Sequence, residues 1–233
     1  MNNKQNVFNL IKGQLIVSCQ ALPEEPLYSS FIMSRMAYAA MLGGAKGIRA
    51  NSIEDIREIK QIVKLPIIGI IKECYEGSEV FITPTNLEVE MLYQEGVDII
   101  ALDATKRMRP DGKTISEVFP EIREKYKDQI FMADCSTYEE AKEAYELGFD
   151  CLGTTLNGYT DYTKGSDLPD LDLIKILVEE FPIPVIAEGG IWTPEQLKRV
   201  FELGVHAAVV GTAITRPMEI TKRFLNAIQQ VES

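Results

Sequence analysis

The sequence is poor in histidine, which limits the catalytic and metal-binding arrangements that it can build. His206 is the only histidine among 233 residues. A Ser-His-Asp triad would therefore have to use His206, and a transition-metal site with several histidine ligands is excluded. His206 directly precedes an expected strand, which places it at the amino end of a parallel sheet. We expect His206 to have a structural role there.

Cysteines are also few, and their spacing follows no metal-binding pattern. Cys19, Cys74, Cys135 and Cys151 are scattered, and no CxxC pair occurs. In this context they are predicted to be free thiols in a reducing cytoplasm. A zinc site is the alternative, but it lacks both the ligand spacing and the histidines that such sites use.

Long apolar runs and an excess of positive charge are missing as well. No window approaches the roughly 18 consecutive apolar residues of a membrane span. The first residues, MNNKQNVFNLIKGQ, lack the apolar core and cleavage pattern of a signal peptide. The net charge of -11 argues against nucleic acid and anionic membranes as partners. If the substrate is an anion, a few arginines and lysines must create a local positive field.

The chain does contain a repeated pattern, in which a short apolar run is followed by an amphipathic segment. We count eight rounds of it. The expected strands span residues 14–20, 47–50, 66–72, 98–105, 129–135, 151–155, 184–187 and 207–213. The expected helices span 29–43, 52–63, 85–95, 115–127, 138–148, 170–181, a segment opened by Thr193, and 217–231.

This alternation predicts a closed barrel. Alternating strands and helices favour a parallel sheet, and strands that are apolar at nearly every position favour burial on both faces. Eight repeats in a chain of this length indicate an α/β fold, the (β/α)8 TIM barrel. We expect residues 1–233 to form one domain, with residues 1–13 as an N-terminal extension or helix. An open doubly wound sheet is the alternative, but no GxGxxG follows the first strand.

In a barrel of this kind, functional groups lie at the carboxyl ends of the strands. Lys72, Glu188 and Arg49 are expected to face one mouth. Less specific interpretations remain open: Lys72 as a solvated strand end, Glu188 as only an ion-pair partner of Lys72 or Arg49, and Arg49 with Asp134 as only a charge network. The residues at the strand ends are Ser18, Gln20, Arg49, Lys72, Asp103, Asp134, Thr154, Thr155, Glu188, Gly211 and Thr212.

Glycines mark a candidate phosphate site. Gly189-Gly190 follow the seventh strand and Gly211-Thr212 follow the eighth, which are the two loops that hold phosphate in many barrels. Bare backbone amides and a nearby helix N-terminus suit a phosphate dianion, and Arg216 can add a bidentate contact. The alternative is that the glycines only make tight turns. Tyr159 either reaches the site or covers it, and residues 160–170 are a candidate lid or a mobile loop.

Eight motifs in order resemble the N-acetylmannosamine-6-phosphate 2-epimerases of bacterial sialic-acid degradation. The resemblance extends from about residue 14 to about residue 226. It implies a phosphate-binding TIM barrel that inverts C2 of N-acetylmannosamine 6-phosphate to give N-acetylglucosamine 6-phosphate, with no redox or metal cofactor. The motifs are IVSCQA, GIRAN, PIIGIIK, ALDAT, MADCST, LGTTLNGYT, VIAEGGIWTPEQ and VVGTAITRP.

The resemblance also implies roles for single residues. Lys72 corresponds to the family's proton-transfer residue and Glu188 to its catalytic companion. Asn157 stands where histidine is a common variant, so we expect no acid or base from that loop. The remaining correspondences are Arg49 and Asp134 as substrate or network contacts, Gln20 as a substrate contact and Arg216 as a phosphate ligand.

Two mechanisms and several rival functions follow from these assignments. In the first mechanism, Lys72 transfers the proton on both faces of C2 and Glu188 adjusts the pKa of Lys72. In the second, Lys72 and Glu188 each transfer a proton on one face. The nearest rival is a Schiff-base aldolase or lyase acting on a phosphosugar through Lys72. A pentose-phosphate 3-epimerase would need metal-binding histidines, and a sugar-phosphate sensor would not need the Lys72–Glu188 pair. We also expect a cytoplasmic homodimer.

Overall fold

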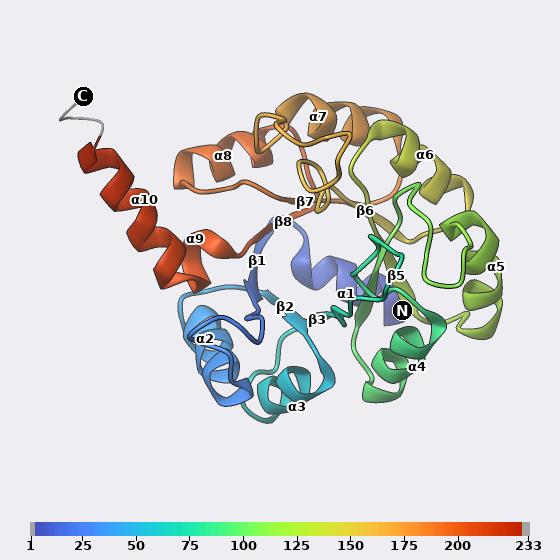
Figure 1. The fold of residues 1–233 in the computed structure, drawn as a ribbon, viewed down its shortest axis with the longest axis horizontal. Helices are drawn as coiled ribbons and strands as arrows, with labels where there is room; N and C mark the ends of the chain where they lie inside the picture. Colours follow the sequence, from blue (N-terminus) through green and yellow to red (C-terminus); the bar gives the residue numbers. More distant parts are fainter. Residues whose placement is uncertain (1–2, 230–233) are drawn as a thin grey trace.

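Eight parallel strands close into one barrel in the computed structural model, which describes residues 3–229 (Figure 1). Each strand pairs with the next one in the sequence, and the last pairs with the first. The predicted (β/α)8 barrel is therefore confirmed, and the open-sheet alternative is wrong. The strands are β1 (Gln14–Cys19), β2 (Gly47–Asn51), β3 (Ile67–Ile70), β4 (Ile99–Asp103), β5 (Ile130–Asp134), β6 (Cys151–Gly153), β7 (Val185–Glu188) and β8 (Ala207–Val210).

Helices follow the strands and form the outer layer. Thr85, Thr137 and Thr193 each cap a helix through a capping box, which Glu88, Glu140 and Gln196 complete. The helices are α1 (Asn3–Ile11), α2 (Ser30–Leu42), α3 (Ile53–Ile62), α4 (Asn86–Glu95), α5 (Ile115–Lys125), α6 (Tyr138–Glu146), α7 (Leu171–Glu180), α8 (Pro194–Glu202), α9 (Thr212–Thr215) and α10 (Pro217–Gln229).

The strands are apolar at successive positions because both of their faces are buried. Ile16, Ile99 and Met132 belong to the cluster that fills the barrel interior. Val17 and Ile100, one position further along β1 and β4, pack under the surrounding helices. Alternate side chains of a strand point to opposite faces, so a strand between two apolar layers needs apolar residues throughout.

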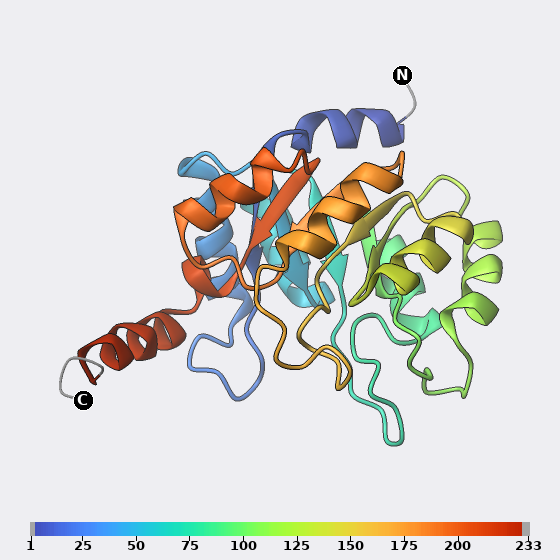
Figure 2. The same ribbon diagram turned by 90° about the horizontal axis from the view of Figure 1, so that it is seen from above.

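Helix α1 closes the amino end of the barrel. Val7, Phe8 and Ile11 pack into the interior cluster, and Figure 2 shows α1 at the end opposite the long loops. His206 lies beneath this helix, with its Nε2 atom 2.9 Å from the Phe8 carbonyl oxygen. The sequence left an extension or a helix open for residues 1–13, and α1 lies within this range. His206 lies at the amino end of the barrel, as its place before the eighth strand predicts.

Six strands (β1, β3, β4, β5, β6 and β8) end earlier than predicted, and this moves site residues from strands into loops. Strand β3 ends at Ile70, and Lys72 forms an isolated antiparallel bridge with Ile82 in the loop that follows. Strand β6 ends at Gly153, before Thr154 and Thr155. The expectation that the eighth strand continues to residue 213 is wrong, because the short helix α9 begins at Thr212.

Helix α10 does not cover the barrel. It begins between α8 and α2 and runs outward, away from the strands (Figures 1 and 2). None of its side chains is buried, and Phe224, Leu225 and Ile228 are exposed. No helix formed by residues 3–229 has the length and apolar character of a membrane span.

Candidate active site

A cavity of about 190 Å³ opens at the carboxyl ends of the strands. Nine of the eleven predicted site residues line it, and they come from the ends of five strands or from the loops that follow. Its walls also include Phe81, Ile82, Leu156, Ile191 and Trp192, which the sequence analysis did not assign to the site. The predicted residues at the cavity are Gln20, Lys72, Tyr159, Glu188, Gly189, Gly190, Gly211, Thr212 and Arg216.

Lys72 lies at the base of this cavity, directly after β3. Its backbone amide donates to the Asn51 Oδ1 atom at 2.7 Å. Burial lowers the pKa of Lys72 to about 8, with the nearby charges of Arg49 and Arg216 acting in the same direction and those of Glu188 and Glu25 opposing them. Among the residues that the structure describes, no carboxylate oxygen lies within 4.0 Å of Nζ. At a pKa of about 8, roughly a tenth of the Lys72 side chains are neutral at pH 7, and half are neutral at pH 8.

Arg49 lies behind the cavity and holds two carboxylates. Its Nη2 atom is 2.6 Å from Asp134 Oδ2, and its Nη1 atom is 3.2 Å from Asp134 Oδ1 and 3.0 Å from Glu188 Oε2. Arg49 and Asp134 are almost fully buried, at 1% and 0% side-chain exposure. Burial alone would lower the pKa of Arg49, but the charges of Asp134 and Glu188 raise it above the ordinary value. Arg49 therefore stays cationic, and neither it nor Asp134 is among the residues that line the cavity.

Glu188 ends β7 and does line the cavity. Burial raises its pKa above the ordinary value, as does the charge of Asp134, whereas the charge of Arg49 lowers it. The Thr154 hydroxyl donates to the Glu188 carbonyl oxygen at 2.8 Å and fixes the end of the strand. Of the two ion-pair partners expected for Glu188, Arg49 is the one observed.

Glycine turns form the opposite side of the cavity. Gly189 and Gly190 have φ angles of 106° and 67°, which side-chain-bearing residues rarely adopt. A Cβ atom on Gly190 would lie 2.1 Å from Leu168 Cβ, so this glycine also lets the loop of residues 160–170 pack against the turn. Arg216 extends into the same region, and its Nη2 atom is 2.9 Å from Glu25 Oε2.

The helix N-terminus nearest these glycines is already satisfied by its own residues. Gln196 Oε1 accepts from the Trp192 and Thr193 amides at 2.8 and 3.1 Å. The Gln196 amide in turn donates to Thr193 Oγ1 at 3.2 Å. The amides left for an anion at this turn are those of the glycines rather than those of α8.

The remaining candidates are not all at the cavity. Asp103 is fully buried and accepts hydrogen bonds from Arg107 Nη2 at 2.6 Å and from the Thr105 hydroxyl at 2.7 Å, so its contacts are structural. Asn157 donates to the Ser136 carbonyl oxygen at 2.9 Å and holds the loop in place. Tyr159 lines the cavity while remaining 59% exposed. All four cysteines are free thiols, as predicted. No three histidine, cysteine, aspartate or glutamate side chains within residues 3–229 form a group that could hold a metal ion.

The fold and the site together define a TIM-barrel enzyme whose buried lysine and clamped carboxylate face one mouth. Comparisons with known proteins agree with this class. A family described as "Putative N-acetylmannosamine-6-phosphate epimerase" matches residues 33–230. The chain belongs to this N-acetylmannosamine-6-phosphate epimerase family.

Relatives match along nearly their whole length. A "Putative N-acetylmannosamine-6-phosphate 2-epimerase" of Clostridioides difficile is 56% identical, covering 94% of this chain and 97% of the relative. A protein of the same name from Clostridium perfringens is 55% identical, covering 96% and 100%. A solved structure described as the N-acetylmannosamine-6-phosphate 2-epimerase from Clostridium perfringens superposes with a TM-score of 0.90 at 55% identity, covering 94% of this chain and 95% of that one.

Proposed function

We propose that this protein interconverts N-acetylmannosamine 6-phosphate and N-acetylglucosamine 6-phosphate by inverting C2. The observation that carries the proposal is that Lys72 lines the same cavity as Glu188, a carboxylate held by Arg49, and burial lowers the pKa of Lys72 there. The C2 hydrogen is next to the C1 aldehyde of the open-chain sugar. Its removal is therefore proton chemistry that these two side chains can perform.

The proposed chemistry needs a base, a stabilised anion and a proton donor. A neutral Lys72 amine takes the C2 proton, and the electron pair of the C–H bond moves into an enolate on C1. The buried positive charge of Arg49 and the new Lys72 ammonium stabilise this negative charge in a low-dielectric cavity. A proton delivered to the other face of C2 completes the inversion. The oxidation state of the sugar is unchanged, so the proposal needs no redox cofactor.

Two routes for the second proton fit the site. Lys72 returns a proton to the other face with Glu188 tuning it, or Glu188 donates from that face. The second route requires C2 to lie between Lys72 and Glu188, whereas the first requires both faces of C2 to reach Lys72. We assign the substrate contacts to Gln20, Tyr159, the amides of Gly189, Gly190 and Gly211, the Thr212 hydroxyl and Arg216, with Asp134 acting through Arg49.

Turnover in D₂O tests the proposal directly. Incubation with N-acetylmannosamine 6-phosphate should yield N-acetylglucosamine 6-phosphate carrying deuterium at C2, observed by proton NMR. Lys72→Ala should abolish both turnover and label exchange. Lys198→Ala, which removes a 78% exposed lysine of α8, is the control and should leave both rates unchanged. Label exchange by Lys72→Ala at the wild-type rate would contradict the role of Lys72.

The Schiff-base alternative predicts a different product of the same lysine. A lyase would form a covalent imine between Lys72 and the sugar carbonyl, and borohydride would trap it as a stable adduct. Family membership favours the epimerase over this alternative. We therefore expect mass spectrometry after borohydride treatment with substrate to show unmodified Lys72.

We further propose that the protein is a cytoplasmic homodimer that acts in sialic-acid degradation, with residues 1–233 forming one domain. Membership of the N-acetylmannosamine-6-phosphate epimerase family supports this cellular role. The unpaired cysteines support a reducing compartment. The exposed apolar residues Phe224, Leu225 and Ile228 of α10 support association with a second copy of the chain.

A further inference from the structure

The Thr155 hydroxyl lies between the two carboxylates of the site. Its Oγ1 atom is 2.6 Å from Asp134 Oδ1 and 3.1 Å from Glu188 Oε2. Gly153 permits this approach, since a Cβ atom at that position would lie 3.2 Å from both Asp134 Oδ1 and Thr155 Oγ1 and 2.4 Å from Met132 Cε. The absence of a side chain at residue 153 therefore keeps the Thr155–Asp134 contact short.

One hydrogen has to serve these two acceptors. A hydroxyl group carries a single proton, so Oγ1 can donate to Asp134 or to Glu188 at any moment, but not to both. Asp134 accepts hydrogen bonds from both Nη atoms of Arg49 and keeps them without Thr155. Within the described residues, Glu188 Oε2 has only its ion pair with Arg49 Nη1 and the hydrogen bond from Thr155, so the hydroxyl matters more to Glu188.

The same contacts leave one oxygen of Glu188 free. Within residues 3–229, Oε2 is held by Arg49 and Thr155, whereas Oε1 has no hydrogen bond. Because Glu188 lines the cavity, Oε1 is the atom that can exchange a proton with a sugar. The charged groups that face Glu188 are Arg49 of β2, Asp134 of β5 and Lys72 after β3.

We propose that Thr155 is a positioning residue for the epimerase reaction: its hydroxyl hydrogen turns toward Glu188 when that carboxylate is ionised and toward Asp134 when Glu188 is protonated. The hydroxyl thereby stabilises the charged form of Glu188 and keeps Oε1 directed into the cavity. This inference rests on the proposed function for the role of Glu188, but the hydrogen bond itself can be tested without turnover.

The decisive experiment is an NMR titration of the Glu188 carboxyl carbon in protein labelled with ¹³C-glutamate, with the signal assigned from Glu188→Gln. A hydrogen bond to an ionised group favours that form, so its loss raises the pKa. Thr155→Val should move the Glu188 midpoint upward by about one pH unit, and Thr155→Ser should stay close to wild type. An unchanged midpoint in Thr155→Val would overturn the inference.

Kinetics provide the second measurement. The lower break of the pH profile of kcat/KM reports the pKa of Glu188. In Thr155→Val this break should move upward by the same amount as the NMR midpoint, and in Thr155→Ser it should return to the wild-type position. A uniform loss of activity at every pH, with both breaks unchanged, would show a merely structural role and overturn the inference.

If Thr155→Val does not fold, as judged by circular dichroism, Thr155→Ala removes the same hydroxyl. A wild-type protein without turnover would refute the proposed function, whereas the titration would still decide the role of Thr155.

Discussion

Lys72 and Arg49 are both basic side chains at the site, but they differ in how many carboxylates contact them. Arg49 contacts two carboxylates and keeps its charge. Lys72 has none within 4.0 Å in the described part of the chain, so burial and the neighbouring arginines lower its pKa to about 8. One cation therefore supplies a fixed field, and the other supplies an amine that gains and loses a proton.

The pH dependence of turnover should follow Lys72. If the neutral amine removes the C2 proton, kcat/KM rises with pH until Lys72 is deprotonated. For a pKa of about 8, the neutral fraction grows roughly 50-fold between pH 6 and pH 8. Initial rates from pH 6 to 9.5 measure this. A profile that falls over the same range would mean that Lys72 acts in its protonated form.

A variant of Glu25 tests the direction in which a neighbouring charge shifts the pKa of Lys72. The negative charge of Glu25 raises the pKa of Lys72. Glu25→Gln should therefore lower this pKa and move the upper break of the kcat/KM profile, which reports Lys72, to lower pH. The substitution preserves the shape of the side chain and leaves Lys72 and Glu188 unchanged. A break that moves upward would contradict this electrostatic explanation.

Arg49 should also be essential for stability. Arg49→Met leaves Asp134 and Glu188 buried without their cation, which costs about 3–5 kcal/mol of unfolding free energy. Arg57→Met removes an arginine that is 65% exposed and pairs with Glu95, and it should cost no more than about 1 kcal/mol. Urea denaturation measures both. The Arg49→Met deficit should shrink at pH 5, where the unpartnered carboxylates take up protons.

At the scale of elements, the loop after β6 is fixed to its neighbours at several points. Tyr162 bonds to Glu140 of α6, and Lys106 Nζ lies 4.0 Å from the centre of the Tyr162 ring. Leu168 packs against Gly190 in the turn after β7. The loop therefore connects the helices beside β5 with the glycines proposed to bind phosphate.

Gly190→Ala should disturb this contact and the site together. The added Cβ atom would lie 2.1 Å from Leu168 Cβ and 3.0 Å from its carbonyl carbon, so the loop has to move. We expect kcat/KM to fall by about tenfold or more, because misplaced binding groups are costly. Gly165→Ala is the matched control, with φ at 91° and open space around the added atom. An equal loss in both variants would mean that backbone strain alone is responsible.

The periodicity of the sequence was sufficient to predict the barrel, since the strands are mostly apolar and helices α3, α4, α6 and α8 follow a Ser or Thr that caps them. The loop after β3 was not predictable in the same way. Its pairing of Ile82 with Lys72 brings Phe81 and Ile82 to the cavity, and local composition does not indicate what a loop packs against. Val210 and Gly211 continue an apolar run, so the turn into α9 was missed.

The orientation of the side chains near the strand ends could not be predicted from the sequence either. The prediction brought Arg49 and Asp134 to the mouth together with Lys72 and Glu188. Asp134 does end β5, but Arg49 lies two residues before the end of β2. The structure brings these residues together but puts Arg49 and Asp134 beneath the cavity. Barrel register decides which side chains point inward and how deep they lie, and register follows from all eight pairings at once.

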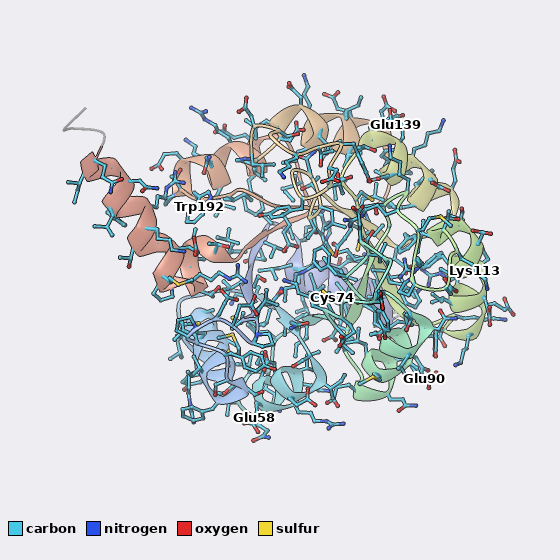
Figure 3. All side chains as sticks on the ribbon, in the orientation of Figure 1. Glu58, Cys74, Glu90, Lys113, Glu139 and Trp192 are labelled. Carbon is cyan, nitrogen blue, oxygen red and sulfur yellow. The ribbon has the colours of Figure 1, made fainter. Side chains whose placement is uncertain are left out.

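At the scale of the whole molecule, α10 is a helix whose apolar residues Phe224, Leu225 and Ile228 are exposed in the described chain. Its Arg223 lies 4.7 Å from the centre of the Trp192 ring, and Figure 3 shows Trp192 beside this part of the fold. The amphipathic pattern of residues 217–229 predicts a helix, but only the tertiary structure shows that the apolar side faces solvent. Such a surface is typical of an interface between subunits.

Charge on α10 should therefore prevent association. Phe224→Glu combined with Ile228→Glu should convert the proposed dimer into a monomer in light scattering after size-exclusion chromatography. Leu87→Glu places the same charge on α4, at a side chain that is 60% exposed, and should leave the dimer intact. A wild-type protein that elutes as a monomer would refute the dimer and leave the active-site proposals unaffected.

The position of α1 has a practical consequence for attaching this protein to a surface. This helix closes the barrel at the end opposite the cavity, with Phe8 packed inside and contacting His206. An anchor placed ahead of α1 would hold every molecule with its mouth facing the solution, so that substrate could enter freely. An anchor placed after α10 would instead crowd the helix on which the proposed dimer depends.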